Sequence, residues 1–377
     1  KLRIYFSNLY FDFFKEKHMV NADDIARQIL KNCDISDASN AGMYSICGLA
    51  LRLRDLYKWE HGLPPWEERN SAEVLEWIET KENDWDRCTD DEFQHILLNG
   101  KRFDPFDTIG INTVLESHNL YYGAGYARSL KPTFFLAEIK EKSELDGIPI
   151  YVLERELARD LLTIPALSQD NCVLLRQDSA RLFLWDSIFY IKKSARPALE
   201  FALIKCGIED QQTETLRRNL AGILEAQKGS YIYHEIGELN ESVFDRDIWR
   251  EIIGTFPYSP VEYLARAVKD LLADTNEFGT LQHIIKERNS AALGLYVAFL
   301  DGLMKEFFPE LPVSFQEFMQ TRDWYRIERA VADGHKTAAG HASMIMNIYQ
   351  EGVGKNDLPW AERQIQKRLL GKYKKKG

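Results

Sequence analysis

The spacing of apolar and polar residues divides the chain into two regions with different periods. In the first region, helical spacing predicts helices over 21–33, 41–62, 70–81 and 89–100. The last two begin with variants of the capping box, Asn70 with Glu73 and Thr89 with Glu92. Residues 103–132 are glycine-rich and show little period, so we expect them to form mostly loop.

The period changes to two after Pro132. Residues 133–142 and 148–154 alternate between apolar and polar positions, and an Asp146-Gly147 turn signal lies between them. This pattern predicts a β-hairpin over 133–153. We therefore expect residues 1–153 to form an N-terminal α+β region that ends in a β-hairpin.

Helical spacing returns at Glu154 and persists to Gly352. It predicts helices over 154–162, 178–207 with a break at Pro197, 213–229 ending at Gly229, 259–274, 290–308 and 323–352. The fold class is therefore mainly α, with a helical bundle over 154–352 of at least six helices and no strand longer than three residues. Residues 353–377 form a C-terminal extension with a basic tail.

Charge and composition exclude several classes of partner. The formal net charge is -10, which argues against a nucleic-acid or membrane-surface binder because both partners are anionic. No apolar run reaches the roughly 18–20 residues of a membrane helix. The five cysteines contain no Cys-x-x-Cys pair, so we expect reduced thiols in a cytoplasmic protein. A homo-oligomer is compatible with this composition.

The stretch from Glu328 to Gln350 combines ligand-type side chains with small residues. Glu328 and His335 are seven residues apart, two turns along one helix face, and alanines continue that face. Such a stripe is typical of metal sites in helical bundles, but also of a core helix that packs closely against its neighbours. Asp301, at the edge of the apolar face of 290–308, is a second candidate ligand, because a carboxylate that leaves water needs a partner. The segment 233–249 supplies further ligand-type residues, but its composition favours a charged connector between helices. These residues are His234, Glu235, Glu238, Asp245 and Asp247.

The order of the segments "LFLWDSIFYIKKSARPALEFALIK", "LRRNLAGILEAQKGSYIYHEIGELNES", "ALGLYVAFLDGLM" and "ERAVADGHKTAAGHA" resembles the haem-oxygenase-like iron-containing redox enzymes. The resemblance covers about residues 155–352. It implies a helical bundle that holds two non-haem iron ions, without haem or nucleotide, and acts on a small organic substrate.

The resemblance also implies a set of metal ligands. Glu235, Asp301 or Glu287, Glu328 and His335 match the family pattern, and Asp245 stands where the family has a histidine. His234 and His341 are alternative imidazole ligands. The implied function is an iron-dependent oxidase or oxygenase.

Two other functions remain open. A bundle that has lost its metal would serve as a binding or assembly module, with a leucine-filled centre instead of five or six inward ligands. In the first region, Glu138 and Lys140 form a Glu-x-Lys pair 31 residues after Asp107, the pattern of a Mg²⁺-dependent nuclease. That function requires Asp107 to approach Glu138.

Overall fold

The computed structural model describes residues 21–371, so the lysines of the basic tail lie outside the described residues. The chain begins with three helices, α1 (Ala22–Asn40), α2 (Ile46–Glu60) and α3 (Ser71–Cys88). A short hairpin follows, β1 (Ile96–Leu98) and β2 (Lys101–Phe103), and then α4 (Thr108–Leu115). Single 3₁₀ turns lie at 41–43, 116–118, 128–130 and 193–195.

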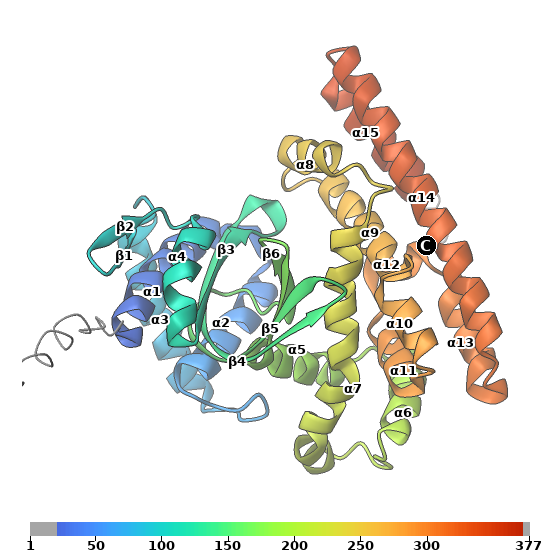
Figure 1. Cartoon of the computed structure of the whole chain (residues 1–377), viewed down its shortest axis with the longest axis horizontal. Helices are drawn as coiled ribbons and strands as arrows, with labels where there is room; N and C mark the ends of the chain where they lie inside the picture. The colour runs from blue at the N-terminus through green and yellow to red at the C-terminus, as the bar shows by residue number, and fades with distance from the viewer. Residues whose placement is uncertain (1–20, 372–377) are drawn as a thin grey trace, which may run out of the picture.

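A five-stranded sheet forms the centre of this half of the molecule (Figure 1). Its strands are β3 (Leu120–Tyr126), β4 (Pro132–Leu145), β5 (Ile148–Arg159), β6 (Ala166–Gln169) and β7 (Cys172–Arg176), in the order β3-β4-β5-β7-β6. Only β5 and β7 are parallel. The Gln169 side chain accepts from the Ala124 N–H and donates to the Tyr122 carbonyl, so it links the two edge strands of the sheet.

The hairpin predicted over 133–153 is confirmed and is longer than expected. Its turn is the predicted Asp146-Gly147 pair, and both residues have positive φ. The prediction of a helix over 154–162 is wrong, because β5 continues to Arg159. The prediction that 154–352 contains no strand longer than three residues is also wrong, since β6 and β7 follow.

Two further predictions in the first half are wrong. Residues 89–100 form no helix, since Ile96–Leu98 is a strand that turns back at Asn99 and Gly100, both with positive φ. An Asn-Gly pair favours a tight hairpin, and this local preference prevails over the apparent helix stop. The stretch expected to be mostly loop contains α4 and β3. Asn112 stabilises β3 by bonding both backbone groups of Tyr122.

The remainder of the chain is helical, so the mainly α fold with an N-terminal sheet region is confirmed. The helices are α5 (Gln177–Phe189), α6 (Arg196–Lys205), α7 (Thr213–Asn240), α8 (Arg246–Thr255), α9 (Pro260–Thr275), α10 (Thr280–Lys286), α11 (Ser290–Phe299), α12 (Gly302–Phe307), α13 (Glu310–Thr321), α14 (Trp324–Gly354) and α15 (Leu358–Leu370). Helix α7 contacts β6 and β7 on one side and α9, α10 and α11 on the other, so it lies between the sheet and the other helices (Figure 1). Across residues 21–371, no helix is both apolar enough and long enough to span a bilayer.

Several helix ends differ from the prediction. Helix α7 runs through Gly229 and ends at Asn240. Gly229 does not end the helix but allows His283 to pack closely, since a Cβ at this position would lie 2.9 Å from His283 Nε2. The helix predicted over 290–308 is broken into α11 and α12 at Asp301 and Gly302, and Gly302 has positive φ. Helix α14 confirms the helix over 323–352, and the extension beyond it contains α15.

A loop of the sheet region is fixed to the helical region by a buried carboxylate. Glu262, in the first turn of α9, is 0% exposed. It accepts hydrogen bonds from the Ser129 N–H at 2.6 Å and the Tyr258 N–H at 3.2 Å, and pairs with Arg266 at 2.9 Å. Ser129 and Leu130 both have positive φ, an unfavourable conformation for residues with a side chain. The bonds to Glu262 therefore hold the 127–131 loop in this conformation.

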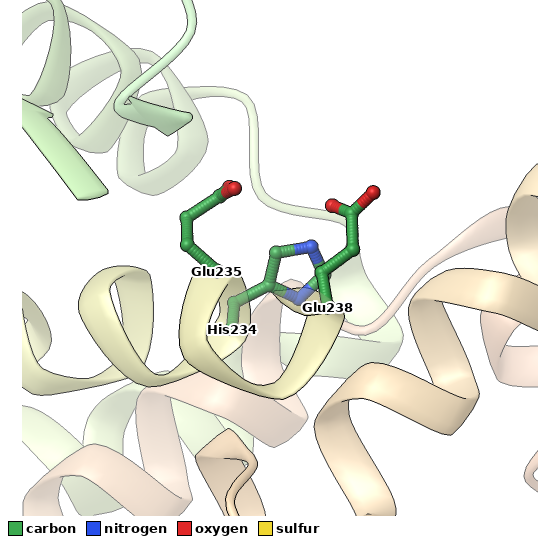
Figure 2. A group of neighbouring side chains, drawn as sticks. All are labelled: His234, Glu235 and Glu238. Atoms are coloured by element: carbon green, nitrogen blue, oxygen red, sulfur yellow. The ribbon is translucent and has the colours of Figure 1, made fainter. Parts of the chain in front are cut away.

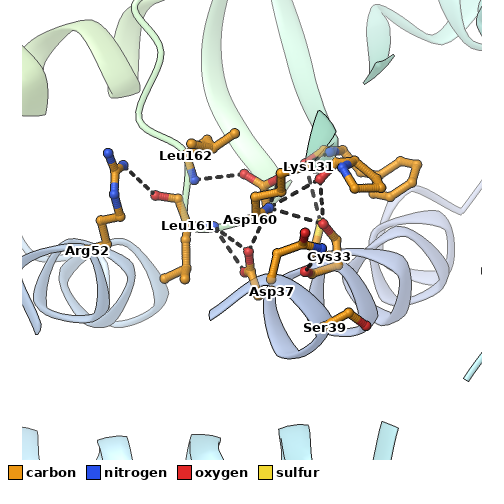
Figure 3. A network of polar contacts seen from close by, with 12 residues as sticks. Cys33, Asp37, Ser39, Arg52, Lys131, Asp160, Leu161 and Leu162 are labelled. Carbon is orange, nitrogen blue, oxygen red and sulfur yellow. Dashed lines mark hydrogen bonds and ion pairs between the residues drawn. The ribbon is translucent and has the colours of Figure 1, made fainter. Parts of the chain in front are cut away.

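A buried ion cluster holds α1 against the end of β5 (Figure 3). Lys131 Nζ lies 2.9 Å from Asp37 Oδ1 and 3.2 Å from Asp160 Oδ2, and all three side chains are at most 1% exposed. The carboxylates also accept the N–H groups of Leu161 and Leu162, where the chain leaves the sheet. Burial raises the pKa of Asp37 to about 7 although Lys131 acts to lower it. The lysine charge therefore offsets part of the cost of burying the carboxylate.

Candidate metal site

The inward face of α7 changes character halfway along the helix. Its first half is apolar, and its second half carries polar side chains on the same face, at spacings of three and four residues. The apolar residues are Leu216, Leu220, Ile223 and Leu224, and the polar residues are Gln227, Ser230, Tyr231, His234, Glu235 and Glu238. A polar face inside a domain departs from the usual pattern of a core helix, and such departures often mark functional sites.

Three of these side chains form a group with the composition of a metal site. One ligand atom from each of His234, Glu235 and Glu238 lies within 4.8 Å of the other two. Figure 2 shows the imidazole ring between the two carboxylates, with His234 and Glu235 adjacent on α7 and Glu238 about one turn later. Within residues 21–371, no other group of three histidine, cysteine or acidic residues meets at this distance.

The orientation of His234 is fixed from α9. Its Nδ1 lies 2.9 Å from Asp274 Oδ1, and the other oxygen of Asp274 accepts from the Tyr296 hydroxyl at 2.7 Å. Burial acts to lower the pKa of His234, but Asp274 outweighs it, with Glu235 and Asp270 adding to the effect, and raises the pKa to about 10. Nδ1 is held by Asp274, so Nε2 is the ring nitrogen that a metal ion would reach, and the ion would displace the proton that the raised pKa keeps there.

Burial and one lysine control the charges of the two glutamates. Glu235 is 7% exposed, and burial raises its pKa, while His234, Lys269 and Ser168 of β6 act to lower it. Lys269 of α9 forms an ion pair with Glu238. Burial lowers the pKa of Lys269 to about 8, against the effect of nearby carboxylates. The site thus contains two cationic groups of the protein that would compete with a metal ion, the Lys269 ammonium and the protonated His234 ring.

Of the ligands predicted from the resemblance, Glu235 and the alternative ligand His234 belong to this group, and the others lie elsewhere. Asp245 caps the N-terminus of α8 by accepting the N–H groups of Asp247 and Ile248. Asp301 is exposed and pairs with Lys192 at 2.6 Å.

The other three predicted ligands also have separate roles. Glu328 pairs with Arg288 at 3.2 Å, and Glu287 is the C-terminal cap residue of α10. His335 Nδ1 lies 3.1 Å from Thr275 Oγ1, and burial lowers its pKa. These placements do not fit a pair of iron ions, which requires about four carboxylates and two histidines around one centre.

The residues of the predicted nuclease site are engaged elsewhere. Asp107 accepts the Gly110 N–H at the start of α4. Glu138 pairs with Arg155, and Lys140 pairs with Glu154. The structure therefore offers no support for a Mg²⁺ site built on the hairpin.

Sequence reasoning named His234, Glu235 and Glu238 among the ligand-type residues of 233–249, but it interpreted that segment as a charged connector between helices. Lys269, Asp274 and Tyr296 were not predicted. The signal for Glu238 is its spacing from His234, four residues later on the face that begins with Leu216. The prediction that α7 ends at Gly229 concealed this continuity.

The comparisons with known proteins match the chain in two parts. The N-terminal domain of a family of unknown function (DUF6866) matches residues 24–176, and the C-terminal domain of the same family matches residues 181–368. The two matches cover most of the chain, so the protein belongs to this family. The boundary between them coincides with the start of α5. The searches of curated proteins and of solved structures gave no match.

Proposed function

We propose that the protein binds one divalent transition-metal ion at His234, Glu235 and Glu238. The observation that carries the proposal is the convergence of these three side chains within 4.8 Å on one helix. An imidazole with two carboxylates suits Mn²⁺, Fe²⁺ or Zn²⁺ better than the all-oxygen sites of Mg²⁺ and Ca²⁺.

The surroundings of His234 support this assignment. Histidine ligands of metal ions commonly donate their second ring N–H to a carboxylate, which fixes the ring and makes the free nitrogen a stronger ligand. Asp274 occupies that position, and Tyr296 holds Asp274 in turn. A buried glutamate such as Glu235 is also expected to gain from a nearby cation.

The proposal includes catalysis, because three protein ligands leave coordination positions open. A bound ion would supply Lewis-acid chemistry there. The resemblance of the helical half to haem-oxygenase-like iron enzymes is a second support for a metal on its central helix. The ligand set differs from that pattern, with one ion instead of two.

A second candidate function is a metal-free binding or assembly module. The ion pair between Lys269 and Glu238 supports it, because the lysine ammonium already neutralises part of the acidic group. Lys269 also lies over the Trp249 ring, 4.5 Å from its centroid. In this alternative, the polar side chains of α7 bond to α9 and hold the two helices together without a metal ion.

Metal content and calorimetry distinguish the two functions. We expect protein purified with Mn²⁺, Fe²⁺ or Zn²⁺ to retain close to one ion per chain, and Glu235→Gln or His234→Gln to abolish retention. Asp301→Asn and Glu328→Gln are matched controls that should retain the ion, since the structure places both residues in other ion pairs. Retention that is lost in these controls and kept in Glu235→Gln would contradict the proposed ligand set.

Lys269→Met tests the competing cation. If the group binds metal, this variant should bind the ion about tenfold more tightly, because a competing charge is removed. If the group is a metal-free contact, the parent retains no ion and Lys269→Met lowers the free energy of unfolding by about 3–5 kcal/mol.

A further inference from the structure

A groove of the sheet region lies apart from the candidate metal site. It has a volume of about 1100 Å³ and lies between α1, α2, α3, the β4–β5 hairpin and the start of α5. Two half-buried indole rings, Trp59 and Trp66, line it together with leucines and prolines. This size and lining suit a small organic molecule.

The charges of the groove are unequally paired. Six carboxylates and five cations line it. Each of the five cations has a carboxylate partner at 2.6–3.6 Å, as in the pairs Lys81–Asp34 and Arg155–Glu138. Among the described residues, the lining carboxylate of Glu60 has no cation within 4.0 Å. Glu60 is exposed at the end of α2.

These observations separate the classes of ligand. An anionic ligand such as a phosphate would find every lysine and arginine of the lining already paired. A cationic ligand would find the carboxylate of Glu60 and the indole faces. Aromatic rings attract cations through their negative faces, and Trp66 already has the Arg217 guanidinium 5.4 Å from its centroid.

We infer that this groove binds an organic cation, a ligand with an apolar or aromatic body and one ammonium or guanidinium group. The ammonium pairs with Glu60, and the body lies against Trp59 and the leucines. Lys81 is a cation close enough to Glu60 for this carboxylate to contribute to the raised pKa of Lys81. Lys81 already forms an ion pair with Asp34 at 2.9 Å, so its charge is shared and Glu60 is not fully neutralised by it.

Isothermal titration calorimetry with matched probes tests the inference. The probes are phenethylammonium, 3-phenylpropionate as the anion of similar shape, and the methylamide of N-acetyl-lysine as a mimic of a peptide side chain. We expect saturable binding of phenethylammonium that is at least about tenfold tighter than that of the anion, because only the cation is complementary to Glu60 and the rings. Tighter binding of the lysine derivative would identify a peptide as the source of the cation.

Two variants and one control locate the binding. Glu60→Gln should weaken the affinity for the cation about three- to tenfold. Trp59→Leu should weaken this affinity as well. Because Trp59 Nε1 donates to the Glu156 carbonyl, circular dichroism must first show that this variant is folded. Glu76→Gln, an exposed glutamate of α3 outside the lining, should leave the affinity unchanged. Equal binding of the anion, no saturable binding of either cation, or an unchanged affinity in Glu60→Gln would overturn the inference.

Discussion

Replacement of Lys131 by methionine tests whether the buried ion cluster depends on the lysine charge. The substitution keeps an unbranched side chain of similar length but leaves Asp37 and Asp160 without the cation at 2.9 and 3.2 Å (Figure 3). Removal of one partner of a buried ion pair costs about 3–5 kcal/mol, because the remaining charge stays out of water. We expect a loss of this size in the free energy of unfolding at pH 7.

The loss should depend on pH in a defined direction. Burial raises the pKa of Asp37 to about 7 in the parent already, so the parent shares most of the pH dependence of this group. The pKa of Asp160 is lowered in the parent, where Lys131 is the largest cause that acts against burial, and without that charge burial raises it. A carboxyl group whose pKa is higher in the folded state stabilises that state while it is protonated, and this contribution decreases as the pH rises above the unfolded pKa of about 4. Between pH 5 and 7 the cost of the substitution should therefore grow by up to about 2.7 kcal/mol through Asp160, since each pH unit contributes about 1.4 kcal/mol.

Urea unfolding followed by circular dichroism at pH 5, 6 and 7 measures both effects. Lys142→Met is the matched control in β4, the strand that begins one residue after Lys131, because Lys142 is 44% exposed in its pair with Glu116. We expect the control to change the free energy of unfolding by less than about 1 kcal/mol at each pH. The reasoning is refuted if Lys131→Met costs no more than the control at pH 7, or if its cost is the same at pH 5.

Three further predictions concern single packing and bonding contacts. Glu262→Gln should lower the free energy of unfolding by about 2 kcal/mol and make the 127–131 loop more sensitive to limited proteolysis, since it removes a charged acceptor that is 0% exposed. Gly237→Ala should cost about 2–3 kcal/mol in urea unfolding because its Cβ would lie 2.1 Å from a backbone oxygen of α9, whereas Gly222→Ala, with nothing within 4 Å, should gain about 0.5–1 kcal/mol. Gly334→Ala should cost about 1–3 kcal/mol because its Cβ would lie 2.3 Å from a phenylalanine ring, whereas Gly340→Ala in the same helix should be stabilising. Equal effects of the two substitutions within either glycine pair would contradict the packing argument.

Local sequence signals predicted the elements whose stability is local. The β4–β5 hairpin has a turn signal and a clear period of two, and α9 and α14 have long helical periods, so all three were found. Strand β7 was missed because its five residues are all buried and show no alternation. A short buried run of this kind cannot be distinguished from a helix by period, and its parallel partner β5 is distant in sequence.

The candidate metal site was predicted only in part for a similar reason. Glu235 was found from the resemblance, but its neighbours Lys269 and Asp274 lie on another helix, 34 and 39 residues later in the sequence. Nothing in the local pattern of α9 indicates that these two side chains face α7. The packing of α7 against α9 determines this, and it depends on the close approach at Gly237.

The small residues of α14, which suggested a wall of metal ligands, instead support the helix that orients His234. Ala338 and Ala342 are 0% exposed, and Gly334 lies against the Phe308 ring, so α14 packs closely against its neighbours, including α9. His335 contacts the Thr275 hydroxyl at the end of α9, one residue after Asp274. Because Asp274 holds the His234 ring, the close packing of α14 fixes α9 at the point where the orientation of this ligand is determined. The stripe of small residues therefore acts on the candidate site through α9, one helix away from the ligands themselves.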